Sequence, residues 1–414
     1  MDFMQHPGMK ILHVIPVYEP AWIYGGPVRS VSLLCRELAH LGLDITVYAT
    51  TANGAANLPA NLDQSLDLGG VKVFRFPLQF RLNYFYSPEL ALAIRNSIRS
   101  FDLIHITSIW NYPGLPAARE ARKQGIPYLY SARGSLIQED YPGVWRKNLK
   151  KSLYYRLLLE SNFQYASAIH YTAQMERKQS VPLVGSGLPS FIIPNGIDCN
   201  EFANLPNRVE GLRFFGGLPE NARIVSYLGR LHPRKALDVL IRAFKSLSER
   251  FPETFLLLGG PDGGHETFLR ALVAELGMEA HVRFLGMLNS EQRRLLFGCT
   301  DIFTLTGYRG ENFGMAVVEA MAAGLPVIVS QSVCIYEDIV TDKAGVSVNV
   351  DEAQLTGALT ELLADPEQLR QMGKAAYASA RKRYDKQIVA SRMAVAYQDI
   401  LFNRRSLDCQ WINQ

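Results

Sequence analysis

Cysteine is scarce in this sequence and shows no regular spacing. Five cysteines occur in 414 residues, and no two are close enough to form a Cys-x-x-Cys clip. The odd count and the lack of such a spacing argue against a disulfide framework and against a zinc ribbon. We therefore expect free, buried thiols in a reducing compartment. The five are Cys35, Cys199, Cys299, Cys334 and Cys409.

A strong charge bias and long apolar runs are also missing. Lys and Arg number 43 against 39 Asp and Glu, a net charge of +4, too small to predict a nucleic-acid partner. The longest weakly charged stretch, residues 313–330, contains Glu319, Gly324 and Pro326, so it does not predict a membrane-spanning helix. The apolar run over residues 11–17 is too short for a signal-peptide core. We expect a cytoplasmic protein.

Several motifs of well-known enzyme classes are absent. The two glycine clusters that follow predicted strands, at residues 25–26 and 259–264, do not fit Gly-x-Gly-x-x-Gly, which argues against a dinucleotide-dependent dehydrogenase. No Walker-type loop and no Gly-x-Ser-x-Gly elbow occurs. No two aspartates are spaced i, i+2, so the short acidic clamp that holds a metal against a nucleotide-sugar is missing. The sequence predicts no metal and no other cofactor.

What the sequence does contain is a regular alternation of short apolar runs and helical periodicity. This rhythm predicts α/β folding with mostly parallel sheets covered on both faces. The length allows two or three domains, and the pattern favours two, over residues 1–198 and 199–386. The final helix, over residues 387–402, can pack on either domain. Strands are expected at residues 10–16, 44–49, 71–76, 103–107, 128–131, 224–228, 255–259, 282–285, 302–305 and 327–330, and helices at 28–41, 90–99, 114–124 and 235–250.

The sharpest group of candidate site residues lies at 311–320, after a predicted strand and at the start of a helix. The helix start over residues 313–315 offers free backbone N–H groups and the positive end of the helix dipole, which suit a phosphate. Carboxylates such as Glu311 and Glu319 suit the paired hydroxyls of a sugar or a ribose. Glu319 stands in an otherwise apolar helix, where a lone carboxylate needs a partner. We favour a nucleotide-sugar site over two solvated surface charges.

A second group, residues 229–235, follows another predicted strand. Arg230 can grip phosphate oxygens through two hydrogen bonds, and Lys235 adds a point charge. Two cations of this kind can neutralise a leaving diphosphate without a metal. Taken alone, the segment also fits an ordinary solvated loop. Gly25 and Gly26 follow the first strand and would let the backbone approach a ligand closely.

Residues 145–159 carry several basic side chains and no acidic one. Leucines and tyrosines in the same stretch supply an apolar side. Two interpretations stay open: a basic amphipathic helix that rests on anionic lipid, and a helix packed on its own domain with a solvated basic edge.

Four motifs, in this order and spacing, resemble those of the retaining family 4 glycosyltransferases, which have the GT-B fold. They are Pro194-Asn195-Gly196-Ile197-Asp198, Gly229-Arg230-Leu231 with Lys235, Glu311 with Glu319 eight residues later, and Ala323-Gly324-Leu325-Pro326-Val327. The motifs at residues 110–114 and 133–136 resemble those of the subgroup of enzymes that build bacterial surface polysaccharides. The resemblance implies two Rossmann-like domains that face a cleft. It also implies that the last helix, within residues 387–414, returns to the first domain.

The resemblance further implies a metal-independent transfer from a nucleotide-diphosphate sugar to a saccharide or lipid-linked saccharide, as in exopolysaccharide, O-antigen or capsule synthesis. The second domain would bind the donor and the first the acceptor, at the inner face of the plasma membrane. Glu311, Arg230 and Lys235 would be catalytic, with the two cations on the diphosphate, Glu311 on the donor sugar and Glu319 on the ribose. Donor contacts would also come from Gly25, Gly26, Asn312, Phe313, Gly314 and Met315, and acceptor contacts from Trp110, Asn111 and Arg133.

Two positions depart from the family pattern. Arg133 stands where members often have a histidine, and Ala236 follows Lys235 where glycine is usual. Because arginine cannot act as a general base, two alternatives stay open. One is an inactive nucleotide-sugar-binding or partner-binding scaffold, and the other is a different GT-B enzyme such as an epimerase or a phosphorylase. We expect His105 and His170 to be core residues.

Overall fold

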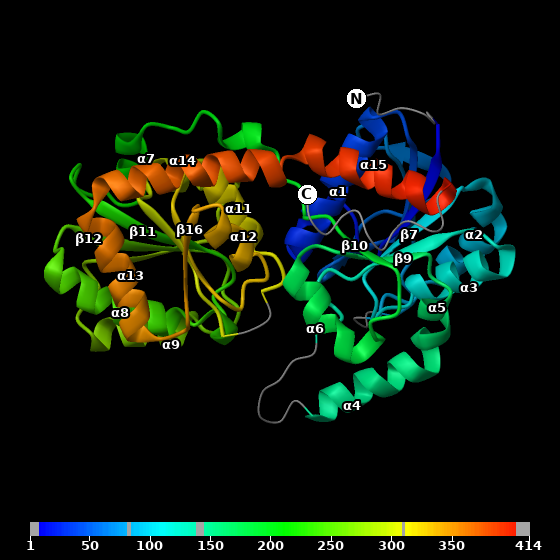
Figure 1. Cartoon of the computed structure of the whole chain (residues 1–414), viewed down its shortest axis with the longest axis horizontal. Helices are drawn as coiled ribbons and strands as arrows, with labels where there is room; N and C mark the ends of the chain where they lie inside the picture. The colour runs from blue at the N-terminus through cyan, green and yellow to red at the C-terminus, as the bar shows by residue number, and fades with distance from the viewer. Residues whose placement is uncertain (1–7, 81–83, 138–144, 309–310, 403–414) are drawn as a thin grey trace. The chain divides into compact units, whose positions relative to one another are not determined.

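The computed structural model describes residues 8–80, 84–137, 145–308 and 311–402, for residues 145–148 the backbone alone. The chain divides into two compact units (Figure 1). Unit 1 comprises Met1–Gly196 and Lys386–Gln414, and unit 2 comprises Ile197–Asp385. The division falls two residues before the expected boundary at 198, because Ile197 already pairs with Asp385 in unit 2. The chain thus enters and leaves unit 2 at adjacent points.

Unit 1 is built on an eight-stranded sheet with the order β10-β9-β8-β7-β1-β2-β6-β5. All neighbours are parallel except β5, which runs antiparallel to β6 at the edge. The strands are β1 (Lys10–Val14), β2 (Asp44–Thr50), β5 (Asn61–Asp67), β6 (Lys72–Phe76), β7 (Leu103–Thr107), β8 (Tyr128–Ser131), β9 (Ala168–Tyr171) and β10 (Ser190–Ile192). A separate hairpin joins β3 (Ala52–Asn53) and β4 (Ala56–Asn57).

Hydrophobic clusters cover both faces of this sheet. Alternate residues of β1 point to opposite sides, so Ile11 joins the cluster under α1 and α15 while Leu12 joins the cluster under α2, α3 and α5. The last helix, α15, lies beside α1 and buries Met393 and Tyr397 in the first cluster (Figure 1). The helices are α1 (Gly26–His40), α2 (Pro88–Ser97), α3 (Gly114–Gln124), α4 (Trp145–Tyr154), a π-helix (Tyr155–Leu159), α5 (Glu160–Gln164), α6 (Gln174–Val184) and α15 (Lys386–Phe402). The core of unit 1 is therefore completed by the end of the chain.

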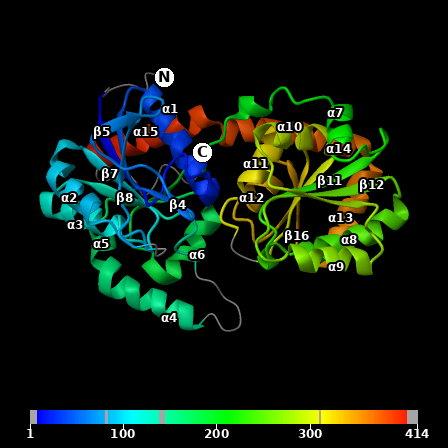
Figure 2. The ribbon, with the colours of Figure 1, turned by 180° about the vertical axis from the view of Figure 1, so that it is seen from behind.

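Unit 2 contains a six-stranded, fully parallel sheet with the doubly wound order β13-β12-β11-β14-β15-β16. Its strands are β11 (Arg223–Leu228), β12 (Thr254–Gly259), β13 (Val282–Gly286), β14 (Ile302–Leu305), β15 (Val327–Ser330) and β16 (Gly345–Val348). Figure 2 shows α8, α9 and α13 on one side of the sheet and α11 and α14 on the other. The helices are α7 (Arg208–Phe214), α8 (Leu237–Arg250), α9 (Glu266–Glu275), α10 (Ser290–Cys299), α11 (Met315–Ala322), α12 (Tyr336–Thr341), α13 (Glu352–Ala364) and α14 (Pro366–Arg383).

The four cysteines in the described ranges, Cys35, Cys199, Cys299 and Cys334, are buried and form no disulfide there, as predicted, and Cys409 lies outside those ranges. Among the helices that the structure describes, none combines the length and the apolar character needed to cross a bilayer.

Candidate active site

The candidate donor residues of unit 2 gather where its sheet changes winding direction. β11 and β14 are neighbours, and the chain moves away from them toward opposite edges of the sheet. Ligands of open α/β sheets bind outside the carboxyl ends of strands at such a switch point. Arg230 and Lys235 follow β11, and Glu311 follows β14. The Lys235 Nζ contacts the Glu311 carboxylate, and both side chains are about one-fifth exposed, at 23% and 22%.

Glycines shape the loop that carries Arg230. The backbone of Gly229 pairs with Gly259 (N–O 2.9 Å), and that of Leu231 pairs with Pro261 (N–O 2.9 Å). A Cβ atom on Gly260, whose φ is +135°, would lie 1.9 Å from the Gly229 carbonyl oxygen. A Cβ atom on Gly263 would lie 2.7 Å from Arg230 Cγ. The cluster at 259–264 therefore lets two loops pack closely and lets the exposed Arg230 side chain cross the second loop.

Lys235 ends a short 3₁₀ turn, Pro233–Lys235, just before α8. The next residue, Ala236, adopts a left-handed conformation with φ +49°. Glycine would enter this region without the steric cost that a side chain brings. Ala236 adopts this left-handed turn in the present chain, and Lys235 just before it contacts Glu311.

Glu311 is held from two directions. Its backbone carbonyl accepts a hydrogen bond from Cys334 N (3.1 Å), and its Oε1 accepts one from Gly314 N (3.0 Å). The expectation that residues 313–315 offer free N–H groups is therefore wrong for Gly314, because Glu311 folds back onto the start of α11 and accepts from its N–H. Phe313 is buried against Tyr384, with ring centroids 5.7 Å apart. Asn312 and Met315 flank this turn and are partly exposed.

Glu319 has a protein partner that the sequence did not reveal. It is 9% exposed on α11, and both carboxylate oxygens accept hydrogen bonds from Arg293 Nη1, at 2.7 and 2.8 Å. Arg293 stands on α10, 26 residues earlier in the chain. The helix ends as predicted, with Gly324 left-handed at φ +76° and Pro326 just beyond.

The candidate residues of unit 1 lie around the corresponding switch point, between β1 and β7. Gly25, with φ +76°, caps the start of α1 and is followed by Gly26, the first helical residue. Trp110 follows β7, and its indole Nε1 donates to Ser135 O at 2.5 Å. Asn111 is 4% exposed, and its Nδ2 donates to Ser108 Oγ at 2.7 Å. Asn111 thus fixes the turn after β7.

Arg133, the residue that departs from the family pattern, makes hydrogen bonds that connect two parts of unit 1. Its Nη1 donates to Ser30 Oγ (2.8 Å), in the first turns of α1, and also to Asn195 Oδ1. Burial lowers the pKa of Arg133 to about 10, so the guanidinium remains charged at neutral pH. Arg133 therefore links the helix that starts at Gly26 with the segment that leads out of unit 1. That structural role does not require a base.

His105 and His170 are core residues, as predicted. Both are buried, and burial lowers the pKa of His170 to about 3 and that of His105 well below its ordinary value. His105 Nδ1 lies 2.7 Å from the Tyr397 hydroxyl of α15. His170 lies 2.9 Å from Ser131 Oγ and 2.7 Å from the Ile193 carbonyl.

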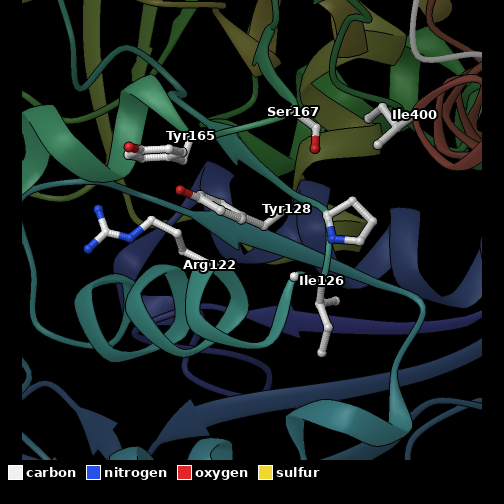
Figure 3. Close-up of a pocket in the computed structure, with 8 residues that line it drawn as sticks. Arg122, Ile126, Tyr128, Tyr165, Ser167 and Ile400 are labelled. Atoms are coloured by element: carbon white, nitrogen blue, oxygen red, sulfur yellow. The ribbon is translucent and has the colours of Figure 1, made fainter.

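A pocket of about 330 Å³ lies at the end of the unit 1 sheet opposite the carboxyl ends of its parallel strands. Figure 3 shows Tyr128 and Tyr165 near Arg122 at one end, and Ser167 and Ile400 at the other. Tyr128 begins β8 and Ser167 precedes β9, so the pocket opens at the amino ends of these strands. It is therefore separate from the carboxyl-end residues described above.

Comparison with known protein families matches both units. Residues 209–379 match the model described as "Glycosyl transferases group 1", and residues 25–196 match the "Glycosyl transferase 4-like domain". The phosphatidyl-myo-inositol mannosyltransferase of Mycolicibacterium smegmatis is 30% identical over 303 residues, 72% of each chain. This chain belongs to the family 4 glycosyltransferases. It is therefore a glycosyltransferase of the nucleotide-sugar-dependent kind.

Other proteins similar to this glycosyltransferase extend the match to nearly the whole chain. D-inositol 3-phosphate glycosyltransferase 2 of Catenulispora acidiphila is 26% identical and covers 96% of this chain and 95% of its own. Sucrose-phosphate synthase from Thermosynechococcus elongatus superimposes with a TM-score of 0.74 at 20% identity, over 95% of this chain and 99% of its own. Anabaena HepE in complex with UDP superimposes with a TM-score of 0.75 at 21% sequence identity, over 94% of this chain and 100% of its own. The fold is GT-B, as predicted.

Proposed function

We propose that this glycosyltransferase moves a sugar from a nucleotide-diphosphate donor to a saccharide or lipid-linked saccharide, with retention and without a metal. The observation that carries the proposal is the contact between Lys235 and Glu311 at the switch point of unit 2, with Arg230 in the same loop. A cation for the diphosphate and a carboxylate for the sugar stand side by side there. A relative named as a GDP-mannose-dependent mannosyltransferase and the HepE structures with UDP and UDP-glucose support a donor of this class.

The contact itself implies how the donor engages the site. A diphosphate that binds Lys235 replaces the Glu311 carboxylate as the partner of the ammonium group. Glu311 is then released to accept hydrogen bonds from hydroxyls of the donor sugar. As the glycosidic bond breaks, Arg230 and Lys235 stabilise the charge that develops on the leaving diphosphate. The acceptor hydroxyl attacks the same face, and a donor phosphate oxygen takes its proton.

A donor panel tests this proposal. The purified protein, with a chelator present, is mixed with UDP, GDP, ADP and dTDP, and thermal unfolding is followed. The matching nucleotide-sugars are then assayed for slow hydrolysis and for transfer to acceptors. We expect one nucleotide to raise the melting temperature and its sugar to be turned over without metal. No shift with any nucleotide, or activity that requires a divalent ion, would contradict the proposal.

Charge-removing variants locate the activity. Lys235→Met and Glu311→Gln should each abolish most turnover while leaving the fold intact. Lys245→Met is the matched control, because Lys245 lies on α8 with its side chain 38% exposed and pairs with its neighbour Glu249 at 3.2 Å. An epimerase would convert its donor without an acceptor, and an inactive scaffold would bind the nucleotide without releasing sugar. Product analysis therefore separates these two alternatives from transfer.

We also propose that unit 1 rests on anionic lipid through the helical segment at 149–158. Four leucines of this segment are exposed between 42% and 71%, and three of them recur every four residues. They are Leu149, Leu153, Leu157 and Leu158. The opposite side buries Tyr155 and Leu159 in the core of unit 1. Unit 1 therefore leaves much of each of these leucine side chains uncovered.

Basic charge accompanies this leucine stripe. Lys150 and Arg156 are exposed beside it. Both views place α4 at the rim of unit 1, away from the sheet (Figure 1 and Figure 2). Exposed leucines flanked by cations suit the acyl and headgroup layers of an anionic bilayer, with ~1 kcal/mol for each basic residue near the surface. A lipid-linked acceptor of surface-polysaccharide synthesis would be met there, at the inner face of the plasma membrane.

Vesicle sedimentation tests the lipid proposal. We expect binding to vesicles that contain phosphatidylglycerol, little binding to neutral vesicles, and weaker binding at high salt. The double variant Leu153→Glu/Leu157→Glu should lose binding. Leu92→Glu, which alters an equally exposed leucine on α2, should retain it. Binding that is the same for all three proteins, or dimerisation that the double variant abolishes, would overturn the lipid assignment.

A further inference from the structure

The contact between Arg293 and Glu319 has a consequence for donor recognition. We infer that Arg293 is a positioning residue that aims the Glu319 carboxylate at the two ribose hydroxyls of the donor. It thereby makes the site prefer ribonucleotides to 2′-deoxyribonucleotides. This inference rests on the proposed function, in which Glu319 is the carboxylate for the ribose.

The geometry fixes the direction of the carboxylate. Arg293 Nη1 lies 2.7 Å from Oε1 and 2.8 Å from Oε2, so one nitrogen holds both oxygens. The terminal torsion of a free glutamate is broad, and the carboxylate plane rotates easily. Chelation by a single donor removes that freedom. The Arg293 side chain is 7% exposed and that of Glu319 is 12% exposed, so the ion pair is largely shielded from water while part of the Glu319 side chain stays open to a ligand.

The carboxylate keeps capacity for a ligand in this arrangement. Each carboxylate oxygen has two lone pairs, and the contact with Arg293 uses one lone pair of each oxygen. One acceptor site therefore remains on each of the two oxygens. Two adjacent hydroxyl groups, such as the 2′ and 3′ hydroxyls of a ribose, present two donors at a matching separation. A 2′-deoxyribose presents only one.

Arg293 is itself held in place. Its Nη2 donates to Ser290 Oγ, at the first residue of α10, at 3.2 Å, and approaches Glu201 Oε1 at 3.4 Å. Glu201 lies in the short 3₁₀ turn Cys199–Phe202 and is 36% exposed. The guanidinium thus spans from this turn to α11. Glu201→Gln keeps an oxygen that can accept from Arg293 Nη2, and Glu201 does not touch the Glu319 carboxylate in these contacts, so this variant is a suitable control.

The test compares matched nucleotides rather than affinities alone. The nucleoside diphosphate that binds in the donor panel is titrated by calorimetry beside its 2′-deoxy or ribo counterpart. A hydrogen bond to a charged group is worth about 1.5–3 kcal/mol, so we expect wild-type protein to prefer the ribo form roughly 10- to 100-fold. Arg293→Lys and Arg293→Met should reduce this ratio to about twofold or less. Glu201→Gln should keep the wild-type ratio.

Each outcome decides the inference. If Arg293 has a purely structural role, its variants will bind both nucleotides more weakly by the same factor. An unchanged ratio of ribo to 2′-deoxy affinity would therefore overturn the inference. Glu319→Gln should lower the preference for the ribo form as much as Arg293→Lys does. The variant that carries both substitutions should lower this preference no further. If wild-type protein binds no nucleotide, the proposed function fails. If it binds a nucleotide but does not favour the ribo form, the donor proposal stands and the inference about Arg293 is wrong.

Discussion

Mild acid should destabilise unit 1, because three histidines are buried without charge in it. His13, His105 and His170 are at most 1% exposed. Burial, with a contribution from the nearby Arg133, lowers the pKa of His13 and His170 to about 3. Burial also holds the pKa of His105 well below its ordinary value. The folded unit therefore keeps all three imidazoles neutral at pH 5.5, whereas an unfolded chain protonates them near pH 6.5.

The sign and size of the effect follow from this difference. Between about pH 3 and 6.5 the unfolded state binds more protons, so the free energy of unfolding falls as the pH falls. At pH 5.5 each histidine costs about 1.4 kcal/mol relative to a pH well above 6.5, and three cost about 4 kcal/mol. Burial raises the pKa of Glu176, which acts in the opposite direction and offsets part of this. A loss of ~3–4 kcal/mol is large against the ~5–15 kcal/mol of an ordinary domain.

Tryptophan fluorescence can follow unit 1 selectively. All four tryptophans, at positions 22, 110, 145 and 411, belong to unit 1. Urea unfolding at pH 7.5 and 5.5 should show the loss in the fluorescence transition. In His13→Asn the loss between the two pH values should shrink by about 1.4 kcal/mol, whatever the absolute stability of the variant. A fluorescence transition that changes by less than ~1 kcal/mol between the two pH values would refute the assignment of neutral buried histidines.

Further predictions concern the site and the last helix. Lys235→Met and Glu311→Gln should each lower kcat by about 100-fold or more in a steady-state assay, and near-normal turnover in both would remove them from the catalytic machinery. Tyr397→Phe should lower the free energy of unfolding of unit 1 by about 2 kcal/mol, since the hydroxyl is 2.7 and 3.1 Å from two buried imidazole nitrogens. An unchanged urea midpoint would contradict this. Gly260→Ala should weaken nucleotide binding, because the new Cβ displaces the loop that carries Arg230, and unaltered affinity in calorimetry would show that the loop adapts.

The buried parallel elements could be predicted from the sequence almost residue by residue. Strands expected at 103–107, 128–131, 302–305 and 327–330 and the helix expected at 114–124 have the same bounds in β7, β8, β14, β15 and α3. Strands covered on both faces consist of continuous apolar runs, and glycine or proline ends the intervening helices. The spacing of the switch-point loops follows from this regularity. Because strands and helices alternate regularly, each family motif could be assigned from the sequence to the strand that it follows.

The parts that the sequence did not predict depend on partners far away in the chain. β5, Asn61–Asp67, is polar and mostly exposed, and only its pairing with β6 makes it a strand. α7 lies in a region without clear periodicity and packs against α10. Arg293 carries no motif, and its pairing with Glu319 depends on the fold, which brings one residue of α10 to one residue of α11. The hydrogen bond from Gly314 N to Glu311 likewise depends on a turn that periodicity does not describe.

The place of α15 in unit 1 has a consequence for the order in which the protein is made. Residues 389–400 fill the same cluster as Met9 and Ile11, yet the whole of unit 2, 385 − 196 = 189 residues, is synthesised between them. At ~5–20 residues per second this interval lasts ~10–40 s on the ribosome. During this interval α15 has not yet packed beside α1, and the apolar side chains of α1 that it will cover remain exposed. The second unit, although later in the chain, can therefore finish folding first, and a chaperone that shields these side chains would raise the yield of native protein.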